Sequence, residues 1–214
     1  MDNKVLSKTF LWMFLGLLVT GIVSWYTYSS GLFLNFIINN TFTILLIVEV
    51  VVVLLFSLLF RKLKPMMVAI LYFVYAIING ISLSTIFAVF DMSSIYLCFF
   101  TAAIAFAIMG FLGYKTNMNL NKFAPMLYGL LFAGVISSLI NLFIGNPTFD
   151  IVISWVVLVA FFGITAYDIQ KIKQLQYADI IPENKLHIYG AMEIYLDFIN
   201  IFLRLLSIFG KRKN

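Results

Sequence analysis

Apolar runs of about twenty residues follow one another along almost the whole chain, and they constrain its fold more than any other feature. A helix needs roughly 20 apolar residues to cross the ~30 Å hydrocarbon core of a bilayer. Of the 214 residues, 63% are hydrophobic and only 11% are charged, which is more apolar material than one soluble core can bury. A water-soluble domain is therefore excluded, and the bilayer is the expected solvent.

Seven such runs are separated by short connectors that contain Asn, Gly, Pro or charged residues. The runs are Phe10–Ser29, Thr41–Phe60, Met66–Phe90, Ile95–Tyr114, Phe123–Ile144, Ile151–Gln170 and Ile188–Phe209. This pattern predicts an all-α polytopic membrane protein with seven transmembrane helices. No connector leaves room for another domain, so residues 1–214 are expected to form a single seven-helix domain.

Basic residues concentrate in alternate connectors, which predicts the orientation of the chain. They are Lys4 and Lys8, then Arg61, Lys62 and Lys64, then Lys115 and Lys122, then Lys171, Lys173 and Lys185. Cytoplasmic loops carry an excess of Lys and Arg, so the amino terminus is expected on the cytoplasmic side. The protein itself is expected in the cell membrane. A seventh crossing would place residues 211–213 outside, against this tendency. The last run either crosses fully, which its length favours, or is re-entrant.

Composition also limits the kinds of partner, cofactor and activity that can be expected. The formal charge of +5 belongs to connectors that face anionic lipid headgroups, so no nucleic-acid partner is expected. Cys98 is the one cysteine, which leaves no disulfide framework and no Cys/His metal cluster. No phosphate-binding loop, His-Glu-x-x-His or Gly-x-Ser-x-Gly motif occurs. We expect no enzymatic activity and no cofactor.

Ionisable side chains inside the apolar runs are the candidate functional residues, because charge in hydrocarbon is costly. They are Glu49, Asp168, Glu193, Asp197 and Arg204. In the last run, one helical face carries a polar stripe, which consists of Tyr189, Glu193, Asp197, Asn200, Arg204 and Ser207. The stripe is expected to face inward. It either lines an ion or proton path or joins the helices through hydrogen bonds.

Asp168 and Asp197 are equally distant in sequence from Pro182 and Glu183, where a helix can break and restart. If the last two runs form an antiparallel hairpin there, both carboxyls lie at one depth. Two carboxyls close together in low dielectric share a proton and titrate as one unit. In the alternative, the sixth helix ends near Lys171 and Asp168 is simply solvated.

Two interpretations are open for Glu49 and Arg204, and two for Arg61. Glu49 and Arg204 have similar expected depths and could form an ion pair, or Arg204 could extend alone toward the headgroups. Arg61 could reach the Asp168 end of the bundle, or serve only to set topology. His187 is expected to be a solvated loop residue.

Glycines in two runs predict close helix contacts, which small residues permit in membrane helices. They are Gly80 in the third run and Gly110 and Gly113 in the fourth.

Two segments give the sequence a family resemblance: TAYDIQKIK at 165–173 and YLDFINIFL at 195–203. With GISLSTI at 80–86, GYKT at 113–116 and SLINLF at 138–143, they resemble the Bax inhibitor-1 family, especially its bacterial members. The resemblance extends over nearly the whole chain. It implies a seven-helix fold in which two three-helix layers surround a central carboxy-terminal helix.

The resemblance also implies a function. Family members leak calcium across membranes in a pH-dependent way, and their pH sensor is an aspartate pair whose positions match Asp168 and Asp197. An acidic residue in the second span matches Glu49, and a basic one at its cytoplasmic end matches Arg61. The chain departs from the family pattern at Thr85, where many members have proline. It also carries the additional carboxyl of Glu193, and Arg204 falls earlier than the usual basic residue.

We therefore expect a pH-sensitive calcium leak channel or calcium/proton exchanger. Calcium prefers several oxygen ligands, and transient contacts are expected at Asp168, Asp197 and Glu49. The ion path or gate would include Glu49, Arg61, Glu193, Asn200 and Arg204. A second hypothesis is a regulator of a membrane protein partner such as a membrane-bound protease. An intramembrane aspartyl protease is disfavoured, because Ile194-Tyr195-Leu196 stands where glycines would be needed before Asp197.

Overall fold

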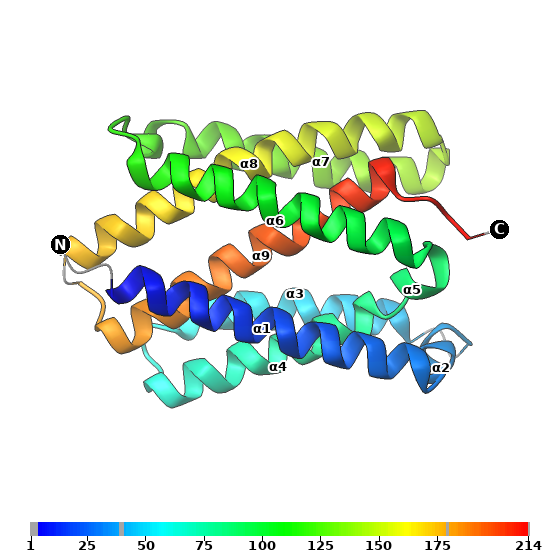
Figure 1. Cartoon of the computed structure of the whole chain (residues 1–214), viewed down its shortest axis with the longest axis horizontal. Helices are drawn as coiled ribbons and strands as arrows, with labels where there is room; N and C mark the ends of the chain where they lie inside the picture. The colour runs from blue at the N-terminus through cyan, green and yellow to red at the C-terminus, as the bar shows by residue number, and fades with distance from the viewer. Residues whose placement is uncertain (1–3, 39–40, 179, 214) are drawn as a thin grey trace. The chain divides into compact units, whose positions relative to one another are not determined.

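The computed structural model describes residues 4–38, 41–178 and 180–213, and these ranges are almost entirely helical. The elements, labelled in Figure 1, are α1 (Lys4–Ser29), α2 (Leu32–Ile38), α3 (Phe42–Leu59), α4 (Pro65–Leu83), α5 (Ile86–Val89), α6 (Met92–Lys115), η1 (Leu120–Lys122), α7 (Ala124–Ile144), α8 (Pro147–Ala178) and α9 (Glu183–Phe209). The expected all-α class is thus confirmed.

Each of the seven apolar runs coincides with a long helix, with differences at the ends. The third run divides into α4 and the short α5, and α8 extends beyond the sixth run at both ends. The short elements α2 and η1 were not expected. Apolar patterning finds the buried or lipid-facing middle of a helix and misses its polar ends, which are helical but carry no hydropathy signal.

Six helical segments in the described ranges are long and apolar enough to cross a membrane. They are Lys4–Ser29, Phe42–Leu59, Pro65–Val89, Met92–Lys115, Ala124–Ile144 and Pro147–Ala178. Helix α9 is not among them, although it has 27 residues. The seventh crossing stays a prediction.

Local sequence explains where several helices begin and end. Lys64 is extended and Pro65 opens α4, since proline at the first helical position loses no hydrogen bond. Gly145 adopts a left-handed conformation with φ of 67° and ends α7, and Pro147 opens α8. The expected break near Pro182 is confirmed, because α9 begins at Glu183.

The chain divides into two compact units. The first comprises Met1–Phe90, Leu175–Tyr195 and Lys213–Asn214, and the second comprises Asp91–Gln174 and Leu196–Arg212. Helix α9 thus contributes its first half to one unit and its second half to the other. The single domain and the central position of the last helix stay predictions.

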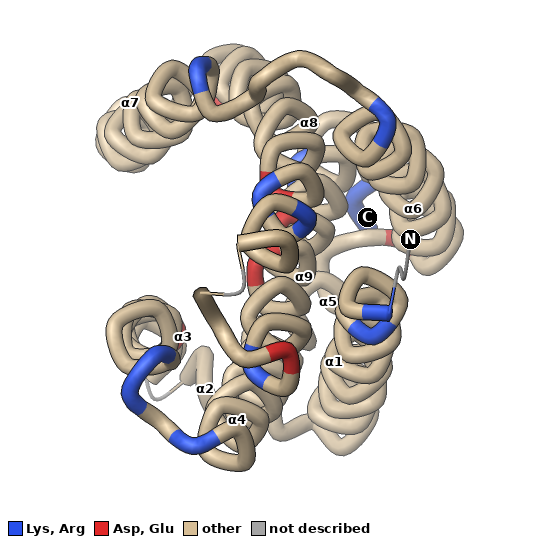
Figure 2. The backbone as a smooth tube through the Cα atoms, turned by 90° about the vertical axis from the view of Figure 1, so that its left-hand side faces the viewer, with Lys and Arg blue, Asp and Glu red and all other residues tan. Residues whose placement is uncertain are grey.

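In the first unit, α4 packs against α1 and α3, and α1 and α4 lie side by side in Figure 1. A Cβ atom at Gly80 would lie 2.8 Å from the Thr20 carbonyl oxygen of α1. The predicted close contact at Gly80 is therefore confirmed. The connector between α3 and α4 carries basic residues, which are blue in Figure 2.

In the second unit, α6 packs closely against α8. A Cβ atom at Gly113 would overlap the backbone carbonyl of Ala166, two residues before Asp168. The predicted close contact at Gly113 is confirmed. Gly110 is less constrained, since the nearest atom to such a Cβ lies 3.8 Å away in Ile169.

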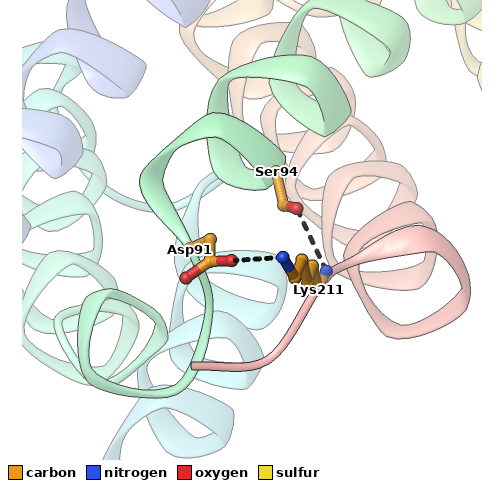
Figure 3. Close-up of polar contacts among 3 residues, drawn as sticks. All are labelled: Asp91, Ser94 and Lys211. Carbon is orange, nitrogen blue, oxygen red and sulfur yellow. Dashed lines mark hydrogen bonds and ion pairs between the residues drawn. The ribbon is translucent and has the colours of Figure 1, made fainter. Parts of the chain in front are cut away.

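The carboxy-terminal segment of the second unit is fixed at the start of α6. Lys211 Nζ lies 3.9 Å from Asp91 Oδ2, and the Lys211 backbone N–H donates to Ser94 Oγ at 3.0 Å (Figure 3). The Asp91 N–H also donates to the Lys211 carbonyl at 2.9 Å. The backbone of this segment is therefore hydrogen-bonded, although its Lys211 side chain is exposed.

We predict that Gly113→Ala lowers stability by about 1–3 kcal/mol, because overpacking a tight contact forces the backbone to shift. The measurement is the thermal unfolding midpoint of the purified protein in detergent. Gly129→Ala in α7 is the matched control, since a Cβ there meets nothing within 4 Å. The control should be neutral or stabilising, because alanine favours a helix by about 1 kcal/mol over glycine. Equal midpoints for both variants would contradict the tight α6–α8 contact.

Candidate functional site

Asp168 lies within α8, ten residues before the helix ends at Ala178, and is only 3% exposed. The alternative in which the helix ends near Lys171 and Asp168 is solvated is therefore wrong. Lys171, one turn later, places its Nζ 3.8 Å from Asp168 Oδ1. Polar residues at the end of an apolar run gave no signal that the helix continues for another two turns.

Asp197 lies on α9 and is also 3% exposed. It belongs to the same compact unit as Asp168. Burying a carboxylate is costly unless it is paired or hydrogen-bonded, so two buried aspartates in one unit are unlike ordinary packing residues. Their sharing of a proton stays a prediction.

The polar stripe of α9 is not uniformly buried. Tyr189 and Asp197 are buried, whereas Glu193, Asn200, Arg204 and Ser207 are half-buried. The Asn200 side chain donates to the Leu196 carbonyl of its own helix at 2.8 Å. Most residues of the stripe are therefore partly exposed, whereas the buried residues of α9 are mostly apolar.

At the carboxy-terminal end of α9, polar residues of α8 approach the stripe. Ser207 Oγ donates to Asp150 Oδ2 at 3.4 Å and lies 3.2 Å from Ser154 Oγ. The Asp150 carboxylate also attracts the Arg204 guanidinium. Glu49, the partner considered for Arg204, belongs to the other unit, and that ion pair stays a prediction.

Glu49 lies in the first unit, on α3, and faces two polar side chains of α4. These are Asn79 and Ser82, both of which are buried. Glu49 also acts electrostatically on the Tyr195 hydroxyl of α9. The carboxyl thus forms part of a polar cluster inside this unit, which we call the Glu49 cluster: Glu49, Asn79, Ser82, Tyr195 and Thr20.

Tyr195 is the centre of the hydrogen bonds in the Glu49 cluster. Its hydroxyl donates to Asn79 Oδ1 at 3.0 Å and lies 2.7 Å from Thr20 Oγ1. Thr20 Oγ1 in turn donates to the Ala76 carbonyl at 2.9 Å. These three contacts share two hydroxyl protons, one on Tyr195 and one on Thr20. The cluster joins helices α1, α4 and α9.

Sequence reasoning missed the roles of Thr20, Asn79 and Tyr195. Thr20 and Asn79 are polar residues inside apolar runs, which was the available signal. Neither side chain titrates, so neither belongs to the set of ionisable residues inside the apolar runs. Tyr195 was recognised only as part of a family motif.

Arg61 is exposed, just past the end of α3. Its guanidinium lies 5.8 Å from the centre of the Phe60 ring, and its carbonyl accepts a hydrogen bond from Lys185 Nζ at 3.0 Å. Both interpretations of Arg61 stay open, since Asp168 belongs to the other unit.

His187 departs from its expectation. It lies on α9 rather than in a loop, is only 9% exposed, and contacts the ring of Trp12 at 5.9 Å between centroids. Its Nδ1 bonds the Glu183 carbonyl at 2.6 Å. Burial lowers the pKa of His187 below its usual value, and the Lys8 charge acts in the same direction. The restart of α9 five residues before the apolar run explains the difference.

In the described ranges, no three His, Cys, Asp or Glu side chains gather in an arrangement that could hold a metal ion. The calcium contacts expected at Asp168, Asp197 and Glu49 are transient contacts with a transported ion. They stay a prediction.

Long apolar helices with buried carboxyls define this chain as a polytopic α-helical membrane protein. The chain belongs to the Bax inhibitor-1 family, because the family model described as "Inhibitor of apoptosis-promoting Bax1" matches residues 2–214. The resemblance read from the two aspartate segments is thus confirmed.

Curated relatives of similar length support this membership. The inner membrane protein YbhL of Escherichia coli K12 is 35% identical, over 97% of this chain and 92% of the relative. Uncharacterized proteins of Borreliella burgdorferi and Rickettsia prowazekii are 31% and 33% identical, each over 99% of this chain and over 94% and 91% of their own lengths. The first relative is named as an inner membrane protein, which agrees with a membrane location here.

We predict that Tyr195→Phe lowers stability by about 1–3 kcal/mol, because it removes the hydroxyl that donates to the buried Asn79 Oδ1 and contacts Thr20 Oγ1. The thermal midpoint in detergent measures the effect. Tyr26→Phe on α1 is the control, since that side chain is 64% exposed. A Tyr195→Phe variant as stable as the control would show that the cluster's hydrogen bonds contribute nothing.

We predict that His187 makes stability pH-dependent. Because its folded pKa is lowered below the usual 6.5, the unfolded chain binds the proton more readily, and stability is lost as the pH falls through that usual value. The wild-type thermal midpoint should fall between about pH 7.5 and pH 5.5 by more than that of His187→Asn. His187 is the only histidine, so equal slopes would assign the pH dependence to carboxyls.

Proposed function

We propose that this protein is a pH-sensitive calcium leak channel or calcium/proton exchanger of the cell membrane, with Asp168 and Asp197 as its proton switch. The observation that carries the proposal is the burial of both carboxyls, each 3% exposed, in one compact unit. In a low-dielectric interior, a charge on one of two nearby carboxyls disfavours a charge on the other. Such groups respond to pH together.

The switch would operate through α8 and α9. A proton shared by the two carboxyls holds the helices together, and its loss leaves two like charges that separate them. One unit of pKa difference between two conformations corresponds to about 1.4 kcal/mol, which changes their populations tenfold. The energy of a single proton is therefore sufficient to gate a two-state protein.

The ion path would include the Glu49 cluster. Glu49 is the only charged residue of α3, and the oxygens of Asn79 and Ser82 lie near it. Calcium binds several oxygen ligands at once. The oxygens of Glu49, Asn79 and Ser82 would bind the ion transiently as it moves along the path. Glu193, Asn200 and Arg204 would line the path or its gate from the half-buried face of α9, with Arg61 acting at the cytoplasmic end.

We predict that Asp168→Asn and Asp197→Asn each remove most of the pH dependence of calcium flux, because either change abolishes the shared titration. The double variant should add little. The measurement is calcium entry into liposomes that contain the purified protein, at several pH values. Wild-type pH dependence in both single variants would refute the switch.

Glu49→Gln is the matched control for this experiment. It should lower calcium flux at every pH without moving the pH midpoint, because it removes an ion ligand and leaves the switch intact. If the wild type gives no flux and copurifies with a stoichiometric membrane partner, the protein is instead a regulator of that partner.

We also propose a cytoplasmic amino terminus and a full crossing by α9, on the basis of the basic connectors and the helix's 27 residues. A cysteine at position 214, which lies outside the described residues, should then react with an impermeant thiol reagent added to intact cells. Cys98 gives little background, since it is 3% exposed. Labelling only after permeabilisation would show that α9 is re-entrant.

A further inference from the structure

The second unit contains a cavity of about 730 Å³ where α7 ends, α8 begins and α9 ends. Its lining contains both polar and apolar side chains. The polar residues whose chemistry matters here are Ser138, Asn141, Asp150, Arg204, Ser207 and Arg212. The proton switch and the Glu49 cluster use none of these residues, and of them only Arg204 belongs to the proposed ion path.

Arg204 contributes a half-buried guanidinium to the cavity. Asp150 attracts its guanidinium but does not approach within ion-pair distance, and the Asp150 carboxylate accepts from Ser207 instead. Within residues 4–38, 41–178 and 180–213, the Arg204 side chain makes no hydrogen bond or ion pair. A guanidinium presents five donors in a planar fork that suits the oxygens of a phosphate.

A second donor on the cavity wall also lacks a partner. The Ser138 hydroxyl of α7 is buried and has no hydrogen-bond partner in the part of the chain that the structure describes. Buried hydroxyls are normally hydrogen-bonded. An anionic oxygen in the cavity would provide an acceptor for Arg204, and for Ser138 once its hydroxyl turns toward the cavity.

The charge of the lining indicates the charge of the ligand. Arg204 and Arg212 are opposed by one carboxylate, Asp150, which leaves one positive charge in excess. A phosphodiester carries one negative charge, so it would neutralise the cavity.

The apolar part of the lining indicates a lipid rather than a free anion. Leu139 and Leu142 of α7 are 54% and 78% exposed, and Ile151 of α8 is 43% exposed. Both helices are candidate membrane spans, so these side chains would face acyl chains. Arg204 lies five residues before the end of α9, roughly 7 Å along the helix, which is comparable with the headgroup layer of roughly 5–8 Å.

We propose that this cavity binds the phosphodiester of an anionic phospholipid, with Arg204 donating to the phosphate oxygens. Ser138 adds a neutral donor, and Leu139 and Leu142 contact the acyl chains. Asp150 opposes binding by repulsion, and so limits the affinity. The site would tie the ends of α7, α8 and α9 to the lipid composition of one leaflet.

The test is calorimetric titration of the purified full chain in nonionic detergent with short-chain phosphatidylglycerol. We expect saturable binding that weakens about tenfold or more in Arg204→Gln, since a charge-assisted hydrogen bond is lost. Asp150→Asn should bind at least about threefold more tightly, because a repelling charge is removed. Lys122→Gln is the control, an exposed cation of the same unit outside the cavity, and should bind as the wild type does.

Two further titrations identify the ligand. Inorganic phosphate and short-chain phosphatidylcholine should both bind at least about tenfold more weakly, because the first lacks acyl chains and the second lacks a net charge. Equal binding of inorganic phosphate would show a free-anion site and overturn the lipid assignment. Equal binding of phosphatidylcholine would overturn the charge argument.

The variants also distinguish binding at this cavity from nonspecific electrostatic attraction of the lipid to the protein. If Lys122→Gln weakens binding as much as Arg204→Gln, the interaction is nonspecific and the proposal is wrong. If Arg204→Gln does not fold by its thermal midpoint, Asp150→Asn decides, and wild-type affinity in that variant overturns the proposal. The readout is lipid binding alone, so its failure leaves the calcium proposal untouched.

Discussion

The absence of water from the bilayer core is the constraint on which the rest of this structure depends. A polar side chain that enters an apolar helix is costly unless it finds a partner in the protein or reaches the headgroups. In the first unit, Tyr195 meets this requirement by joining Thr20 and Asn79 across three helices. In the second unit, Ser207 and Asp150 meet it near the helix ends.

The same constraint makes the buried carboxyls informative. A chain that needed only packing could replace Asp168 and Asp197 with apolar residues of similar volume at little cost. Their burial in one compact unit therefore supports a role in which the proton is the useful feature. The close backbone contact two residues before Asp168, where Gly113 meets Ala166, would transmit a small movement of α8 directly to α6, because packed backbones cannot be compressed.

The sequence predicted much of the helical framework and part of the candidate site. Runs of apolar residues located seven long helices, and the position of Pro182 located the break before α9. The ends were less predictable, since α8 continues to Ala178 through polar residues. His187 was misplaced for the same reason, because polar residues at a helix end resemble a loop in sequence.

The sequence alone determined that the chain is a membrane protein, which family it belongs to, and which ionisable residues lie inside apolar helices. Those properties follow from composition, periodicity and motif spacing, which are local. Only the tertiary structure decided that Tyr195 bonds Thr20, 175 positions away, and that Arg204 shares a cavity with Ser138. Hydrogen bonds and cavities depend on how helices far apart in sequence face one another, and no local pattern records that.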